Sequence, residues 1–520
     1  MSDDVNRISA EGSDLPGDSV NDEAGAAPDE VSIDVGEPAT PPPTRVPGPI
    51  SSLLSDRRLM ALLVVVLVVL AGMYAAMSGI FEEEGRTTPG SVPHDGNASM
   101  PLGFLEPVML DRELQALGTS TQDIPKGVIG YEPSLAVDSQ GNMFYTAHKD
   151  LLWQESWDYL ASWWFISTDN GQTWRNPEDL AWNAPGVGAK YVWAGDEGDI
   201  AVDARDRIYF VDTTLADNNF HVFLGGGDTY EYSKEQGSTL LDDRPWLTAQ
   251  GDGVLHYLGN NGVSVNGARV WYYRSEDGGL TWTSGEPMVG GWATIDAERF
   301  GEHVYVAQVY SDGGEQNIIS YNSADGGHTW NGPVYVGPMV ANGIGEGMPT
   351  VFHGSNGTVF VIWQDSPLGG NAPATLYLAR SDDYGMSFEY WNISMPVGAI
   401  YLYPTVNVCQ YGTYHDHNRL GIAFYATTDI PVGPDSEWYL YATVAEDPWN
   451  GSWFHFERAD PEPVYTGNDL HALHDFFEIV IAPDGTLNIA YQRNIGSHPY
   501  EAGEEQRYLM FVRANVLEEE

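Results

Sequence analysis

The octapeptide Ser323-Ala-Asp-Gly-Gly-His-Thr-Trp330 decides the fold, because it recurs along the chain. Two close copies are Ser275-Glu-Asp-Gly-Gly-Leu-Thr-Trp282 and Ser167-Thr-Asp-Asn-Gly-Gln-Thr-Trp174. A looser copy is Ser381-Asp-Asp-Tyr-Gly-Met-Ser-Phe388. The shared pattern is Ser-x-Asp-x-Gly-x-Thr/Ser-aromatic, and four copies in one chain indicate a repeat architecture.

Each position of the pattern suits a tight hairpin between two strands. The Asp carboxylate is expected to accept hydrogen bonds from backbone N–H groups two or three residues further on. The Gly supplies a positive φ, and the aromatic residue begins the next strand and packs into the layer below. The residues predicted to form these hairpins are Asp169, Gly171, Trp174, Asp277, Gly279, Trp282, Asp325, Gly327, Trp330, Asp383, Gly385 and Phe388.

This pattern resembles the Asp-box, or BNR, repeat of the sialidase-like superfamily. The region from about Leu102 onward is similar to an Asp-box β-propeller. In that family the box lies in the outer hairpin of a blade, on the face away from the ligand site. The resemblance therefore implies an all-β propeller and leaves the chemistry open.

Seven segments read as a short β-rich run, a Gly, Asn or Asp turn and a second run. They cover residues 135–145, 200–210, 246–256, 293–305, 350–360, 404–425 and 478–490. Seven blades are favoured, with boxes in the first, third, fourth and fifth. Six blades with an insertion is the alternative, because sialidase propellers have six. Ring closure should need a strand from one terminus, either Phe104–Leu110 or Tyr508–Val512.

The composition is strongly acidic, with 74 acidic against 23 basic residues and a net charge of -51. Such a chain should repel nucleic acid, whose binding depends on neutralising phosphates. Salt adaptation is the favoured explanation, since counterions screen the self-repulsion, and collection of divalent cations is the alternative. Cys409 is the single cysteine, so no intrachain disulfide forms, and its apolar surroundings predict a buried side chain.

The N-terminal part divides into three segments before the propeller. Residues 1–58 are acidic and rich in Pro, Gly and Ser, which predicts a disordered cytoplasmic tail. Residues 59–80 carry no charge, and at ~1.5 Å per residue they span roughly 33 Å, enough to cross a bilayer. Residues 81–103 read as a polar tether to a propeller over 104–517.

Charges that flank the apolar segment predict its orientation. Arg57 and Arg58 precede it and Glu82 to Glu84 follow it, so the N-terminus should stay in the cytoplasm and the propeller should be extracellular. A cleaved signal peptide is the alternative, but the preceding segment is too long and too acidic for one. Four Asn-x-Ser/Thr sequons, at Asn97, Asn356, Asn392 and Asn450, are compatible with export.

Strand direction predicts where a ligand would bind. The connections that precede each innermost strand and follow each second strand should surround one mouth of the channel, opposite the boxes. The ligand-binding residues predicted there are Glu132, His148, Asp199, Arg244, Trp246, Asp365, His474, Asp475 and Arg493. Aromatic faces beside carboxylates suit sugars, and crowded carboxylates suit Ca²⁺, the one cofactor that the sequence suggests. The alternative is that these residues only end strands and solvate a channel.

Sialidase chemistry is what the resemblance implies if the chain is an enzyme. It needs three arginines that grip a carboxylate, a Tyr nucleophile with a Glu base, and an Asp acid. Only Arg244 and Arg493 fall plainly at the predicted mouth, so an arginine triad is not evident. The candidates for catalysis are Tyr403 with Glu346, and Asp243. No metal site stands out, although His415-Asp416-His417 and the segment from His471 to Asp475 contain histidine and acid.

The sequence thus predicts a membrane-anchored extracellular propeller that binds a glycan or a protein at its channel mouth. A glycoside hydrolase, of sialidase type or with another retaining mechanism, is the first alternative. A scaffold for membrane protein assembly is the second.

Overall fold

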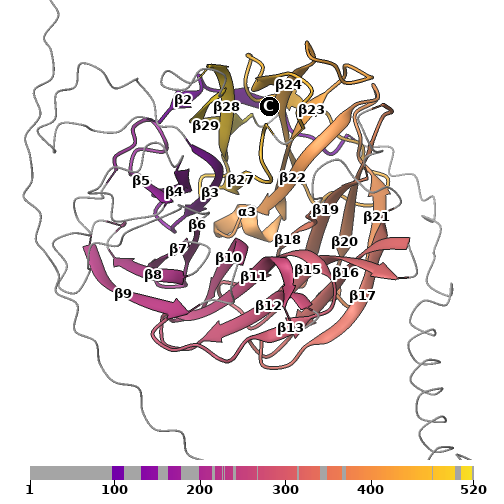
Figure 1. Cartoon of the computed structure of the whole chain (residues 1–520). Coiled ribbons are helices and arrows are strands. Elements are labelled where there is room, and N and C mark those ends of the chain that lie inside the picture. The colour runs from indigo at the N-terminus through magenta and orange to yellow at the C-terminus, as the bar shows by residue number, and fades with distance from the viewer. Residues whose placement is uncertain are drawn as a thin grey trace, which may run out of the picture. The chain divides into compact units, whose positions relative to one another are not determined.

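The structure is a computed structural model, which describes residues 97–110, 130–149, 162–176, 198–213, 217–224, 226–227, 229–237, 242–265, 268–312, 315–339, 348–365, 371–470, 472–497 and 505–517. They belong to one compact unit, Thr87–Glu520, and form seven antiparallel sheets around a central axis (Figure 1). The chain is therefore an all-β propeller with seven blades, and the prediction of seven rather than six is confirmed.

Each blade is a sheet whose strands we call A to D from the axis outward. Blade 1 is β3 (Gly130–Val137), β4 (Met143–Lys149) and β5 (Ser162–Ser167). Blade 2 is β6 (Gly198–Val202), β7 (Ile208–Thr213), β8 (Asp217–Leu224) and β9 (Thr229–Gly237). Blade 3 is β10 (Asp242–Gln250), β11 (Val254–Val265), β12 (Ala268–Ser275) and β13 (Glu286–Met288). Blade 4 is β14 (Gly291–Ala297), β15 (Val304–Asp312), β16 (Glu315–Ser323) and β17 (Asn331–Met339).

The remaining blades follow in chain order. Blade 5 is β18 (Thr350–His353), β19 (Val359–Asp365), β20 (Thr375–Ser381) and β21 (Glu389–Asn392). Blade 6 is β22 (Ile400–Val408), β23 (Arg419–Thr427), β24 (Glu437–Glu446) and β25 (Glu457–Arg458), with β26 (Tyr465–Thr466) beside β24. Blade 7 is β27 (Glu478–Ile481), β28 (Leu487–Ser497) and β29 (Glu505–Val516). All seven predicted inner hairpins are the A–B pairs of these blades.

The ring is closed by residues from the start of the described chain. β1 (Leu102–Phe104) pairs antiparallel with β29, with Leu102 opposite Val516, and so supplies the outer strand of blade 7. β2 (Val108–Met109) pairs with the same strand. The prediction that one terminus completes the blade of the other is confirmed. The chain is already ordered before β1, because the N–H groups of Ala98 and Met100 donate to blade 6.

The four octapeptides lie at C–D turns, as predicted, with Gly at φ of 76° to 87°. In the third copy, Asp325 Oδ1 accepts from the Thr329 N–H at 2.8 Å, and Oδ2 accepts from the Thr329 hydroxyl at 2.7 Å. The N–H groups of Thr173, Thr281 and Ser387 donate to their Asp in the same way. The main backbone donor is therefore four residues after the Asp, because the turn is longer than the two or three residues predicted.

The aromatic residue of a box ties its blade to the preceding blade. Trp330 packs edge-on against Tyr272 of blade 3, with ring centroids 4.9 Å apart. Trp282 lies 4.5 Å from Phe220 of blade 2, and blade 1 is joined to blade 7 in the same way by Trp174 and Phe511, at 5.0 Å. Because a blade shares no backbone ladder with its neighbour, this aromatic packing carries much of the contact between blades.

The C–D hairpin of blade 6 is closed without a box. The Ser452 hydroxyl accepts from the Trp449 N–H at 3.0 Å, and Asp447 accepts from the Asn418 amide of the A–B turn at 2.7 Å. Arg380 of blade 5 donates to the carbonyl of Pro448 there, at 2.9 Å. Arg513 of blade 7 donates in the same way to Asn170 in the box of blade 1, at 3.3 Å. Arginines thus support these C–D turns from a neighbouring blade.

Acid should weaken the boxes selectively. Hydrogen bonds from Thr329, and then from Ser323, lower the pKa of Asp325 to about 2. Because the folded-state pKa is lowered, this contribution to stability is present above about pH 4 and is lost as the pH falls toward 2. We expect Thr329→Val to move the acid-unfolding midpoint to higher pH, whereas Thr428→Val, at an exposed threonine outside any box, should not move it. Equal shifts in the two variants would contradict this role.

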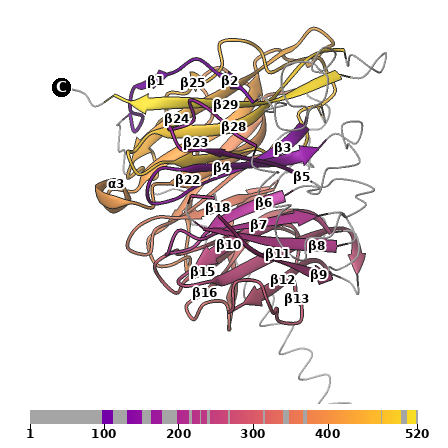
Figure 2. The ribbon, with the colours of Figure 1, turned by 90° about the vertical axis from the view of Figure 1, so that its left-hand side faces the viewer.

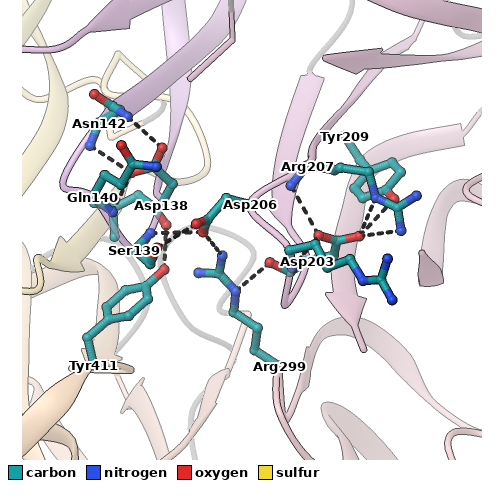
Figure 3. A network of polar contacts seen from close by, with 12 residues as sticks. Asp138, Ser139, Gln140, Asn142, Asp203, Asp206, Arg207, Tyr209, Arg299 and Tyr411 are labelled. Atoms are coloured by element: carbon teal, nitrogen blue, oxygen red, sulfur yellow. Dashed lines mark hydrogen bonds and ion pairs between the residues drawn. The ribbon is translucent and has the colours of Figure 1, made fainter. Parts of the chain in front are cut away.

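Polar contacts join the A–B turns of different blades on the Asp-box face, as Figure 3 shows around Asp206 and Arg299. Arg299 of blade 4 reaches blade 2, donating to the Asp203 carbonyl at 2.7 Å and to the Asp206 carboxylate at 2.6 Å. Tyr411, just before α3 (Gly412–Asp416), donates to the Val137 carbonyl of blade 1 at 2.9 Å. Figure 2 shows α3 and the C-terminal end on the same side of the ring.

Two sequence predictions concern segments that the structure does not reach. Within the described ranges, no helix is both long and apolar enough to cross a bilayer. The predicted span, residues 59–80, and the tail before it lie outside those ranges.

Cys409 is fully buried, as predicted, and burial raises the pKa of its thiol to about 12.

Candidate functional site

The innermost strands begin with β-bulges on the face opposite the boxes, which we call the D–A face. The A–B register shifts between Tyr131 and Ser134, Asp243 and Trp246, Gly291 and Ala293, and Leu402 and Thr405. A left-handed residue lies in each bulge, namely Glu132 (φ 53°), Arg244 (φ 60°), Trp292 (φ 28°) and Tyr403 (φ 51°). His474 (φ 57°) has the same conformation just before β27. Bulky residues seldom adopt a positive φ, so the fold holds these five against a local preference.

Arg244 contacts two other blades at the D–A mouth. Its guanidinium is ion-paired with Asp475 and stacks on the Trp292 ring, 4.1 Å from the ring centroid. These three residues come from blades 3, 7 and 4, so the loop before β27 reaches across the channel opening. Phe476 in the same loop packs against Trp246 of blade 3 at 4.9 Å. The predicted residues Arg244, Trp246 and Asp475 are thus brought together.

A second group lies where blades 7 and 1 meet. The Tyr131 ring is stacked between His148, at 4.1 Å, and His474, at 3.7 Å. The buried Glu132 carboxylate accepts from the Asp475 N–H at 3.1 Å and lies 3.7 Å from His474 Nδ1. The Asp475 backbone and side chain therefore join this group to Arg244. Glu132, His148 and His474 were predicted, whereas Tyr131 was not.

Arg493, the second arginine predicted at the mouth, forms an ion pair with a buried acid. Its guanidinium is ion-paired with Asp460, which is fully buried and also accepts from the Tyr491 hydroxyl at 2.6 Å. Together with the Arg244–Asp475 pair, this means that both arginines predicted at the mouth are already neutralised. Neither is arranged as one member of an open anion-binding triad.

Asp199 lies inside the channel and links blades. It accepts from the Ser134 hydroxyl at 2.6 Å and from the Leu247 N–H at 2.6 Å, which joins blades 1, 2 and 3. The same hydroxyl lies 2.7 Å from Glu478 of blade 7. One hydroxyl proton cannot serve two carboxylates, so both contacts are hydrogen bonds only when one carboxyl is protonated. Burial, and then the charge of Glu478, raise the pKa of Asp199 well above its usual value.

Similar side-chain links join other inner strands, which form no backbone ladder with each other. Thr294 receives the Val351 N–H at 3.1 Å, and Asn407 receives the Ile481 N–H at 3.0 Å. The Asn260 amide of blade 3 accepts from the Ala293 N–H of blade 4 at 2.8 Å and donates to the Ala293 carbonyl at 3.1 Å. The strands enclose a cavity of about 160 Å³. The polar residues that line this channel therefore have a structural task, whatever else they do.

Of the three predicted catalytic residues, the structure describes the side chain of Tyr403 alone. Tyr403 lies in a bulge of β22 and is 5% exposed. Asp243 lies in β10, and its side chain and all of Glu346 fall outside what the structure describes. Asp365 ends β19 and is half-buried. Among the described residues there is no group of three or more His, Cys, Asp or Glu side chains that could hold a metal, and Ca²⁺ stays a prediction.

Three of the four bulges have a signal in the sequence, because their left-handed residue is followed by proline, as Glu132-Pro133, Arg244-Pro245 and Tyr403-Pro404. Met348-Pro349 stands at the same place before β18, where the register does not shift. Proline provides no N–H and restricts the residue before it, so it suits an interrupted start of a strand. The recurrence aligns the blades from their inner ends, independently of the boxes.

The comparisons with known proteins agree with this repeat. A family model of the BNR/Asp-box repeat matches residues 165–176, which contain the whole of the first box. The chain is an Asp-box β-propeller. No curated protein matches its sequence.

Several solved structures are similar to this propeller in fold. The α-L-arabinofuranosidase Arb93A of Fusarium graminearum is 13% identical, over 79% of this chain and 98% of that one, with a TM-score of 0.41. A PL25 ulvan lyase is 11% identical, over 79% and 94%, with a TM-score of 0.41. The NanB sialidase of Streptococcus pneumoniae is 12% identical, over 77% and 70%, with a TM-score of 0.38. None of them bears on the chemistry of this chain.

Proposed function

We propose that this protein is a membrane-anchored recognition propeller, which binds a glycan or protein ligand on its D–A face around Arg244, Trp292 and His474. The observation that carries the proposal is the backbone strain there. Five bulky residues with positive φ surround one opening, and such strain persists where the surrounding structure maintains it for function. The A–B turns of the opposite face use a positive φ mainly at Gly, Asn and Asp.

The chemistry of the mouth suits a ligand with both apolar faces and hydroxyl groups. Trp292 is a partly exposed aromatic ring, and His474 and Asp475 add a partly exposed imidazole and carboxylate to the mouth. The Tyr131 ring is covered on both faces by His148 and His474 and so supports these groups from below. Sugars present C–H faces that stack on aromatic rings, while their hydroxyls bond to carboxylates and imidazoles. A protein loop with an aromatic or polar tip offers the same groups.

Recognition fits this geometry better than sialidase chemistry does. Arg244 and Arg493 are each committed to an acid, at Asp475 and Asp460. A third arginine near the mouth, Arg507, lies over the Tyr131 ring, with its guanidinium carbon 5.3 Å from the ring centroid. The anchor belongs to the proposal because residues 59–80 are apolar and uncharged, with arginines before them and glutamates after them.

The test is a binding measurement on the full chain in detergent at high salt, with a glycan array and a panel of fluorogenic glycosides. We expect binding without turnover. Trp292→Ala should weaken the binding at least tenfold, since an aromatic anchor in an interface often contributes about 2 kcal/mol or more. Trp449→Ala, on the Asp-box face, is the matched control and should leave it unchanged.

Two results would count against the proposal. Turnover of any glycoside that disappears in Glu346→Gln or Tyr403→Phe would make the protein an enzyme. Equal losses of binding in the two tryptophan variants would remove the D–A face as the site.

A further inference from the structure

Exposed apolar side chains gather on the Asp-box face of four adjacent blades. Of the ten large hydrophobic residues that are exposed in the described part of the chain, six lie at its turns. They are 41% to 63% exposed, and we call them the apolar arc: Leu280, Phe300, Tyr384, Met386, Trp449 and Trp453. Figure 1 shows that blades 3 to 6, which carry them, are consecutive in the ring.

The described turns of blades 7, 1 and 2 carry no exposed large apolar side chain, although Leu517, just after β29 of blade 7, is 50% exposed on the same face. The tips there are polar, for example Asp484, Gln140, Gln172 and Arg205. The apolar tips are therefore not a general feature of Asp-box turns. In the box of blade 5, two of the three variable positions are Tyr384 and Met386, where the box of blade 1 has Asn170 and Gln172. The hydrogen bonds that close the turn come from other positions, so turn geometry does not demand these side chains.

The described chain begins beside this arc. Asn97 forms a parallel bridge with Trp453, and the Ala98 N–H donates to the Trp453 carbonyl at 3.0 Å. Only residues 81–96 separate Asn97 from the apolar segment 59–80. Sixteen residues reach at most about 55 Å when fully extended, so an anchored propeller stays near its bilayer, tied on at blade 6.

We propose that the apolar arc is a membrane-contact surface, which rests on the bilayer that holds residues 59–80 and turns the D–A face toward the outside. The proposal rests on the anchor in the proposed function. Trp, Tyr and Phe are favoured at the membrane interface because their rings are apolar and their edges polar. A rim of such side chains on a rigid scaffold would dip into the headgroup region without spanning the bilayer.

The charges on the same turns favour a neutral lipid surface. Three acidic residues of blades 3, 5 and 6 are paired with arginines, in the pairs Glu276–Arg274, Asp382–Arg380 and Glu446–Arg419. Arg380 also lies under the Trp449 ring, 3.7 Å from its centroid. A chain with a net charge of -51 would be repelled by anionic lipid, so the probe is phosphatidylcholine.

The experiment measures lipid proximity on the full chain in phosphatidylcholine vesicles. Cys409 is fully buried, so a fluorophore can be attached selectively at Met386→Cys on the arc, or at Val397→Cys on the D–A face. Both native side chains are exposed, at 54% and 68%. Lipids with a shallow nitroxide quencher should quench the Met386→Cys label at least threefold more than the Val397→Cys label. Adding Trp449→Ser and Trp453→Ser should remove most of that difference.

The outcomes separate the arc from the anchor and from the ligand site. A chain that fails to float with vesicles contradicts the anchor, and the arc proposal falls with it. A chain that floats but shows equal quenching at the two labels overturns the arc and leaves the anchor standing. So does burial of the Met386→Cys label in a self-associated complex without lipid quenching, which would make a second copy the occupant. Ligand binding at Trp292 is measured separately in detergent and can survive either failure.

Discussion

Alanine at the four box glycines should divide them into two classes, although the four share one backbone conformation. Their φ angles are 77°, 87°, 82° and 76° at Gly171, Gly279, Gly327 and Gly385. A Cβ at Gly279 or Gly385 would meet its nearest neighbour at 3.4 Å or 3.5 Å, an ordinary contact. A Cβ at Gly171 would overlap the buried Phe511 ring, and one at Gly327 would overlap the Tyr272 hydroxyl.

We expect Gly279→Ala and Gly385→Ala to lower the free energy of unfolding by about 1–2 kcal/mol each, the cost of a left-handed L-residue. Gly171→Ala and Gly327→Ala add overpacking of about 1–3 kcal/mol, for a total of roughly 2–5 kcal/mol. Phe511 cannot move aside easily, because it packs against Trp174 at 5.0 Å, and Tyr272 is held by a 2.8 Å bond to His256. Denaturant unfolding of the four variants checks this.

Gly251→Ala is the matched control outside the boxes. Gly251 has a φ of 55°, and a Cβ there would meet nothing within 4 Å, so only the backbone contribution applies. Equal losses at all five glycines would show that the contact between blades at the box is not rigid. The assignment of the box aromatic residue as a tie between blades would then be wrong.

The sequence was informative where the structure depends on short-range chemistry. The box is closed by bonds between residues two to four apart, so Ser, Asp, Gly and Thr at fixed spacing were enough to locate it. Blade number followed from counting A–B hairpins, whose two strands are also neighbours in sequence. Blade 6, for which no box was predicted, has Asp447 and Trp453 in its C–D turn, but not at the box spacing.

The candidate site was less predictable because its contacts are long-range. The channel-mouth residues could be named from strand direction alone, but not their partners. Arg244 and Asp475 lie on blades 3 and 7, and they meet because the loop before β27 crosses the opening. Sequence spacing contains no information on that crossing. Nor did it reveal that Arg493 is tied to the buried Asp460, which decides against an open arginine triad.

Glu478→Gln should make folding stability depend less on pH. Glu478 and Asp199 share the Ser134 hydroxyl inside the channel, at 2.7 Å and 2.6 Å. Burial raises the pKa of both carboxyls, and the charge of Glu478 adds to the rise at Asp199. A carboxyl whose folded-state pKa is raised contributes stability fully below its unfolded pKa, near 4, and loses it as the pH rises through the folded value. Each unit of elevation corresponds to about 1.4 kcal/mol.

The difference in unfolding free energy between variant and wild type should therefore change with pH. At pH 4 we expect Glu478→Gln to be no more stable than wild type, because the neutral acid already makes the required hydrogen bonds. At pH 8 the two wild-type carboxyls must either retain one proton or place two negative charges in the channel. The amide that replaces Glu478 carries no charge, so the variant should be the more stable. Asp252→Asn, at a half-exposed surface acid, is the control and should show no such crossing. Parallel curves for Glu478→Gln and wild type from pH 4 to 8 would mean that the two carboxyls titrate independently, with no shared proton linking blade 7 to blades 1, 2 and 3.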